Sequence, residues 1–182
     1  MKKSKVSHLF SIVLTVLVIA SVAYASPVAA ASQEFTANLS GQHEVPPRVT
    51  DATGVATFQL NEDGTALTFS VNVSNIENVV AAHIHCGPKR VNRPVGVTLF
   101  MAAPGGGPVN GTLAKGTITA PDPGNQCGWA DLAAVVAAMN SGNAYVNVHT
   151  NDGVDPTNTG PGDFPGGEIR GQIVPVSDGP KK

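Results

Sequence analysis

The 182-residue chain has few charged and few aromatic side chains: 13% of its residues are Asp, Glu, Lys or Arg, and 5% are Phe, Trp or Tyr. Lys and Arg never gather in a long run, and phosphate contacts need clustered basic residues, so the composition argues against a nucleic-acid partner. The sequence also lacks internal repeats, a Ser-His-Asp order and the paired carboxylates of many hydrolases. Any catalytic or binding site in this chain must therefore be built from a small number of polar side chains.

The one long apolar run lies at the N-terminus. Residues 9–25 carry no charge, follow three lysines and precede small residues, which is the layout of a secretory signal. Cleavage fits before Ser26 or before Ser32, and an uncleaved run of this length is the alternative, as a short membrane anchor.

Cleavage at the later site divides the chain into a signal peptide (1–31), one domain (32–176) and a flexible tail (177–182). The remaining 151 residues carry 8 Lys and Arg against 13 Asp and Glu, a net charge of about −5. We expect a secreted or extracytoplasmic protein that contacts a membrane only through an uncleaved N-terminal segment. Self-association into a homo-oligomer stays open.

The chain has two cysteines, Cys86 and Cys127. An oxidising compartment favours one disulfide between them, closing a loop of about 40 residues and contributing about 3–4 kcal/mol in the chain-entropy model. The alternative is that Cys86 is a thiolate metal ligand beside His85.

Short segments rich in Val, Ile, Thr and Phe, bounded by Gly, Pro, Asn or Asp, recur along the domain. They predict an all-β sandwich or barrel of about eight antiparallel strands. The expected strands are 34–40, 54–60, 66–74, 79–86, 96–101, 111–118, 144–150 and 168–174. One short helix is expected over 130–139, capped by Asp131 and apolar on one face. The Gly- and Pro-rich segment 151–167 is a long loop, and such loops are usually functional or mobile.

Four histidines remain once the signal is removed, namely His43, His83, His85 and His149. Alternation along a strand sends both imidazoles of His83-Ile84-His85 to one face, about 7 Å apart at the backbone. His149 emerges on the polar face of a later strand, with Tyr145 and Asn147. These positions predict a bound metal ion. Copper fits an exported, all-imidazole site best, and zinc is the alternative, since three histidines and a water also form a hydrolytic zinc site.

Four motifs in order give the chain a family resemblance. They are Leu39-Ser-Gly-Gln-His-Glu-Val-Pro-Pro47, Ala82-His-Ile-His85, Gly142-Asn-Ala-Tyr-Val-Asn-Val-His-Thr150 and Pro165-Gly-Gly-Glu-Ile-Arg-Gly-Gln-Ile173. From about Phe35 to Val174 the sequence resembles the CHRD domain, named for chordin. More distantly it is similar to copper-zinc superoxide dismutase, a Greek-key β-barrel.

The dismutase resemblance implies site residues. His83 and His85 match the paired copper ligands, His149 matches the copper ligand on the later strand, and Arg170 matches the arginine that guides the anionic substrate to the metal. A surface or rim ion pair is the alternative for Arg170. Residues 87–94 contain no His, Asp or Glu, so the zinc subsite of the dismutase is not expected here. We count His43 as a fourth ligand, although the CHRD pattern usually carries an amide there.

The predicted function is an exported copper-binding protein with a mononuclear histidine site that disproportionates superoxide. Lys89, Arg90, Arg93 and Arg170 make up half of the 8 positive charges of the domain and would focus a small anion toward the metal. Two alternatives stay open. One is a non-catalytic copper carrier or electron-transfer protein, and the other is an extracellular interaction or adhesion module, which the chordin resemblance implies.

Overall fold

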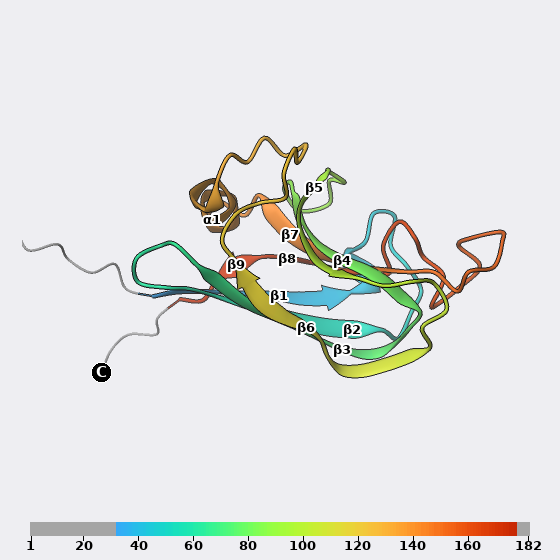
Figure 1. The fold of residues 1–182 in the computed structure, drawn as a ribbon. Coiled ribbons are helices and arrows are strands. Elements are labelled where there is room, and N and C mark those ends of the chain that lie inside the picture. Colours follow the sequence, from blue (N-terminus) through green and yellow to red (C-terminus); the bar gives the residue numbers. More distant parts are fainter. Residues whose placement is uncertain (1–31, 178–182) are drawn as a thin grey trace, which may run out of the picture.

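The computed structural model describes residues 32–177, which form nine strands and one short α-helix (Figure 1). The strands are β1 Gln33–Ser40, β2 Thr53–Leu60, β3 Leu67–Glu77, β4 Val79–Cys86, β5 Val95–Met101, β6 Pro108–Ile118, β7 Ala144–Thr150, β8 Ile169–Gln172 and β9 Val174–Pro175. The helices are η1, a 3-10 helix over Gly41–His43, and α1 over Leu132–Asn140. The predicted all-β fold is confirmed. The bounds of β4 and β7 match the prediction, and the last predicted strand divides into β8 and β9.

All strands pair antiparallel in one sheet with the order β5-β4-β7-β8-β1-β2-β3-β6, and β9 pairs with β1. Because β5 also contacts β6, the two ends of the sheet meet and the sheet is nearly closed into a barrel. Strands β4, β5 and β6 follow one another around it, and β7 returns through α1 to pair with β4. This order is a Greek key.

The barrel interior is filled by apolar side chains that alternate along strands such as β1 and β2. On β1, Phe35, Ala37 and Leu39 are buried, whereas Glu34 and Asn38 face outward. Burying a large apolar side chain contributes about 1.5–3 kcal/mol. Strand β7 departs from this alternation, since all of its residues but His149 are buried. Its outer face is covered by loops, and this covered face carries the candidate site.

Helix α1 begins where the sequence places a cap. The Asp131 carboxylate accepts a hydrogen bond from the Ala134 N–H at 2.9 Å, as predicted. Asp131 itself has an extended backbone, so the helix starts at Leu132 and not at Ala130. Just before the helix, the Trp129 indole packs against Gly96 of β5, in space that any larger residue at position 96 would occupy.

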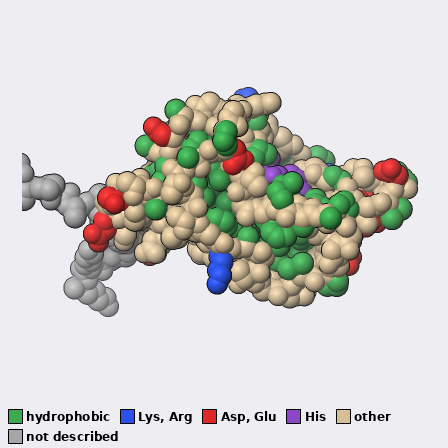
Figure 2. All heavy atoms as spheres, viewed as in Figure 1, with side chains coloured by type: hydrophobic (Ala, Val, Ile, Leu, Met, Phe, Trp, Pro, Cys, Tyr) green, Lys and Arg blue, Asp and Glu red, His purple; other side chains and the backbone are tan. Residues whose placement is uncertain are grey.

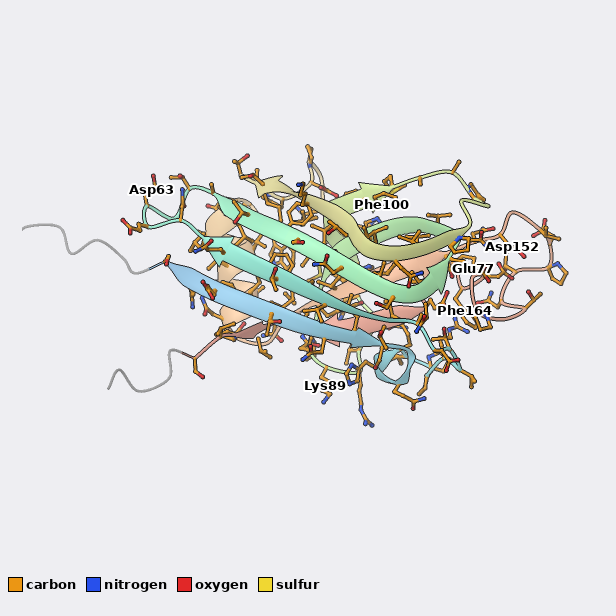
Figure 3. The ribbon with its side chains drawn as sticks, turned by 90° about the horizontal axis from the view of Figure 1, so that it is seen from below. Asp63, Glu77, Lys89, Phe100, Asp152 and Phe164 are labelled. Carbon is orange, nitrogen blue, oxygen red and sulfur yellow. A yellow bond between two sulfur atoms is a disulfide. The ribbon has the colours of Figure 1, made fainter. Side chains whose placement is uncertain are left out.

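The loops lie at opposite ends of the barrel. The β2–β3 hairpin, marked by Asp63, is at one end, and the 151–167 loop, marked by Asp152 and Phe164, is at the other (Figure 3). Among the described residues no helix is long and apolar enough to span a membrane. The predicted signal peptide and nearly all of the predicted tail lie outside the described residues.

Candidate metal centre

Strand register brings three of the four histidines together. On β4, His83 lies opposite Asn147 and His85 lies opposite Tyr145 of β7, and His149 of β7 lies opposite Ala81. Residues opposite one another share a face of the sheet, so the three imidazoles project from the same outer face. The pairing of β4 with β5 shifts register just before His83 and again just before His85. Such bulges are frequent beside functional sites, where they redirect side chains.

The three rings lie close enough to share one ion. Their centroids are 5.6 Å apart for His83 and His85, 5.0 Å for His83 and His149, and 5.7 Å for His85 and His149. One nitrogen of each ring lies within 4.8 Å of the other two. Two nitrogens bound to one metal at about 2 Å are at most about 4 Å apart, so small ring rotations would close the site on an ion.

For two of the three rings, loop carbonyls determine which nitrogen is free. His85 Nδ1 lies 2.8 Å from the Arg93 carbonyl oxygen, and His149 Nδ1 lies 2.9 Å from the Pro165 carbonyl oxygen. A carbonyl oxygen only accepts, so both Nδ1 atoms carry the proton and each Nε2 keeps its lone pair. A metal-ligating histidine typically anchors its second nitrogen in this way.

One nitrogen of each ring is buried and unpartnered. These nitrogens are His85 Nε2, His149 Nε2 and His83 Nδ1. Leaving a buried polar atom without a partner costs about 1–3 kcal/mol, which a metal ion would offset by accepting the lone pairs. The donor set therefore fits a three-histidine metal site.

Burial keeps these rings neutral. It lowers the pKa of His85 to about 4 and that of His149 to about 4, despite the loop carbonyls that favour the protonated rings. Burial also lowers the pKa of His83, and the Asp122 carboxylate partly opposes this shift. Only neutral imidazole binds a metal, so at neutral pH all three ligands are ready to bind. Figure 2 shows that histidine side chains reach the molecular surface.

An aromatic stack borders the cluster. The Tyr145 ring lies on His85 with centroids 4.9 Å apart and planes 11° from parallel. Strand β7, which carries Tyr145, lies between β4 with His85 and β8 with Arg170, and the Arg170 guanidinium carbon lies 3.4 Å from the centroid of the phenol ring. The structure thus places Arg170 behind Tyr145, buried and bonded to the 87–94 loop, with Tyr145 between its guanidinium and His85.

The fourth histidine is not brought into this cluster. His43 ends η1 and is exposed, and its Nδ1 lies 3.2 Å from the Arg170 carbonyl oxygen. Its ring nitrogens lie outside the group that shares one ion site. Across residues 32–177 the three histidines form the one group of side chains that could share a metal ion.

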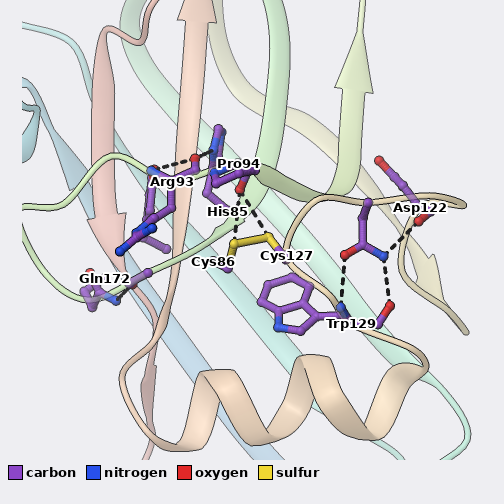
Figure 4. Close-up of a disulfide and its surroundings, with 11 residues drawn as sticks. His85, Cys86, Arg93, Pro94, Asp122, Cys127, Trp129 and Gln172 are labelled. Atoms are coloured by element: carbon purple, nitrogen blue, oxygen red, sulfur yellow. Dashed lines mark hydrogen bonds between the residues drawn. A yellow bond between two sulfur atoms is a disulfide. The ribbon is translucent and has the colours of Figure 1, made fainter.

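The cysteines form the predicted disulfide, between Cys86 and Cys127 (Figure 4). No thiolate remains at Cys86 for a metal, so the alternative of a cysteine ligand is excluded. The bond joins the end of β4, directly after His85, to the segment that leads into α1.

A second buried polar group lies on the same face, and sequence patterns gave no sign of it. Glu44 and Asn147 are 4% and 3% exposed, and the Asn147 amide donates to Glu44 at 3.5 Å. Burial raises the pKa of Glu44 to about 7. Gly167, at a φ of +121°, is required beside them, because a Cβ there would overlap the Asn147 amide.

Comparison with known proteins gives one match. The model of the CHRD domain matches residues 35–173, about three quarters of the chain. No curated protein and no solved structure matches the chain.

Proposed function

The chain belongs to the CHRD domain family, and we propose that it is an exported copper-binding protein whose single centre is held by His83, His85 and His149. The observation that carries this proposal is the convergence of three imidazoles, each of which has one buried, unpartnered nitrogen. The disulfide supports the export of the protein, because disulfides persist in oxidising compartments.

Copper is preferred to zinc for two reasons. All three donors are imidazoles, and copper binds nitrogen sites more tightly than the other divalent metals of its row. Zinc also accepts three histidines and a water, so it is the competitor to be tested against.

We further propose that the centre disproportionates superoxide, converting two superoxide anions and two protons into dioxygen and hydrogen peroxide. Bound copper would supply the one-electron oxidation and reduction. The chain supplies attraction for the anion, because Lys89, Arg90 and Arg93 are exposed on the loop beside His85. It also keeps one ligand accessible, since His83 is only partly buried.

Copper loading tests the binding site. The wild-type protein and the variants His83→Ala, His149→Ala and His43→Ala are loaded, desalted and analysed for metal. We expect about one copper per chain in the wild type and in His43→Ala, whose ring lies outside the cluster, and a loss of copper in the other two. Equal retention by all four proteins would show that copper binds elsewhere.

Two further measurements separate the functions. Competition between copper and zinc for the loaded site gives the preferred metal. Superoxide decay, followed with loaded and metal-free protein, tests dismutation. A site that binds copper without accelerating decay would leave the carrier or electron-transfer role, and a protein that binds no metal would leave the interaction module.

A further inference from the structure

The arginine to which the dismutase resemblance assigned substrate guidance is enclosed by protein. Arg170 is 1% exposed, although it carries a formal charge, and burial lowers the pKa of its guanidinium. Its two terminal nitrogens are already bonded: Nη1 donates to Asn92 Oδ1 at 3.0 Å, and Nη2 donates to the carbonyls of Val91 at 3.1 Å and Pro88 at 3.3 Å. With its donors directed at the protein's own oxygens, the side chain is poorly placed to capture an anion.

These acceptors all belong to one exposed loop. Residues 88–93 are exposed and form neither helix nor strand, so the loop has little packing of its own. Arg90 has a φ of +66°, in a turn where the Val91 N–H donates to the Pro88 carbonyl at 3.3 Å. The hydrogen bonds of Arg170 therefore fix this turn to the sheet. Gln172 fixes the start of the loop by donating to the Gly87 carbonyl at 3.0 Å.

The next residue of the loop contacts the metal site directly. The Arg93 carbonyl accepts hydrogen bonds from His85 Nδ1 at 2.8 Å and from the Tyr145 hydroxyl at 3.3 Å. The Arg93 N–H donates to the same hydroxyl at 3.1 Å. Figure 4 shows the Arg93 backbone directed at the His85 ring. The orientation of His85 thus depends on where the loop places a single carbonyl group.

We propose that Arg170 is a positioning residue: it clamps the 87–94 loop over Tyr145, so that the Arg93 carbonyl and the Tyr145 ring together orient His85 with Nε2 toward the metal. The stack of guanidinium, phenol and imidazole reinforces the clamp from the side of the sheet. This inference rests on the proposed metal site.

The arrangement separates two properties of an arginine, its charge and its shape. A lysine would keep the charge, but it has one nitrogen on a flexible stem and cannot bond three oxygens while lying flat on a phenol ring. Substrate guidance by charge predicts that lysine replaces arginine well. Clamping of the loop predicts that it does not.

The first experiment measures Cu(II) affinity by competition with a chromophoric chelator, for wild type, Arg170→Lys, Arg170→Gln and the control Lys115→Gln. Lys115 is exposed on β6, so its variant removes one charge without touching the loop. We expect both Arg170 variants to bind copper about 10- to 100-fold more weakly and the control to stay within about two-fold of wild type. The copper hyperfine splitting in electron paramagnetic resonance should change in both Arg170 variants and not in the control. Wild-type affinity and splitting in Arg170→Lys would overturn the proposal.

The second experiment needs no metal, so it separates failure of this inference from failure of the proposed function. Hydrogen exchange of the Arg93 amide in metal-free protein should be at least about ten-fold faster in both Arg170 variants than in wild type. Unchanged exchange would overturn the clamp even if copper binds as proposed. Faster exchange in a protein that binds no metal would uphold the clamp and refute the copper site.

A milder variant covers the case in which both Arg170 substitutions unfold the protein. Asn92→Ala removes one acceptor of Arg170 and the Asn92 hydrogen bond to the Val45 carbonyl at 2.7 Å, on an exposed side chain. We expect it to fold, to exchange the Arg93 amide faster than wild type and to bind copper about three- to ten-fold more weakly. An Asn92→Ala protein with wild-type exchange and affinity would contradict the clamp.

Discussion

The buried carboxylate of Glu168 contacts the 151–167 loop, and its removal tests how that loop is fixed over the candidate site. Glu168 is 0% exposed and precedes β8 directly. Its Oε1 accepts from the Thr50 hydroxyl at 2.6 Å, and its Oε2 accepts from the Thr150 hydroxyl at 2.7 Å and the Gly162 N–H at 2.9 Å. Glu168 thereby joins three segments: the stretch before β2, the end of β7 and the 151–167 loop. The perturbation is Glu168→Ala, with Glu168→Gln beside it.

The hydrogen bonds set the expected magnitude. Alanine leaves three donors without an acceptor, of which the Thr150 hydroxyl and the Gly162 N–H are buried and the Thr50 hydroxyl is partly buried. Each of the two buried donors costs about 1–3 kcal/mol, so we expect the free energy of unfolding to fall by about 2–6 kcal/mol. Glutamine keeps one acceptor oxygen for Thr150 and Gly162, and the Thr50 hydroxyl can turn to accept from the new amide. The cost of Glu168→Gln should then be about 1–2 kcal/mol, mainly the lost charge assistance.

Urea unfolding of metal-free protein, monitored by fluorescence of Trp129, measures these free energies. Glu62→Ala is the matched control, because Glu62 is exposed in the β2–β3 hairpin and should change stability by less than about 0.5 kcal/mol. The loop also carries the Pro165 carbonyl that anchors His149. Copper affinity should therefore fall in Glu168→Ala as well. If Glu168→Ala lies within about 1 kcal/mol of wild type, the three bonds do not hold the loop as argued.

Two further predictions concern the disulfide and the pH dependence. Replacing Cys86 and Cys127 by serine opens a loop with a sequence separation of 41, and chain entropy predicts a loss of about 4 kcal/mol in denaturant unfolding; equal stability with and without the bond would contradict this. The pKa values of His85 and His149 fall from 6.5 to about 4 on folding. Their contribution to the stability of the fold is therefore present above pH 6.5 and is lost as pH falls through 4. The pKa of Glu44 rises from 4.5 to about 7, so its contribution is present below pH 4.5 and is lost as pH rises through 7. When the pH of metal-free protein falls from 7.5 to 5, each of the two histidines should lower the free energy of unfolding by about 2 kcal/mol, and Glu44 should raise it by about the same amount. Glu44→Gln removes this offset, so its stability should fall more steeply with acid than that of the wild type. An equal slope in the two proteins would argue against the burial of Glu44.

Side-chain alternation was sufficient to predict that the three clustered histidines share one face of the sheet. His83 and His85 stand two apart in an apolar segment, and His149 ends a segment with the same alternation, so each ring had to leave the barrel on the outer face. Sequence spacing alone does not pair one segment with another. The register that sets β4 beside β7 comes from the Greek-key connection, which was expected here from a family resemblance.

The groups that orient the rings left no trace in the sequence. The acceptors for His85 and His149 are backbone carbonyls of Arg93 and Pro165, and any residue type supplies a carbonyl. Tyr145 was predicted on the correct face, but its stacking between His85 and Arg170 depends on three strands lying in one sheet. His43 illustrates the reverse case, because its residue type suggested a ligand and its position on η1 sets it apart from the cluster.

The motif around β8 now has a physical role in the candidate site. Glu168 and Arg170 stand two apart, so both leave the barrel on the same face, one under each loop. Glu168 binds the 151–167 loop, whose Pro165 carbonyl anchors His149. Arg170 binds the 87–94 loop, whose Arg93 carbonyl anchors His85. Each charge is matched to its loop, since Glu168 accepts a backbone N–H and side-chain hydroxyls, whereas Arg170 donates to loop oxygens. Exchanging the two residues would present acceptors to acceptors and donors to donors. We therefore expect Glu168→Arg combined with Arg170→Glu to lose copper binding, although the three histidines themselves are unchanged. Copper retention by that double variant would show that the rings keep their orientation without the loops.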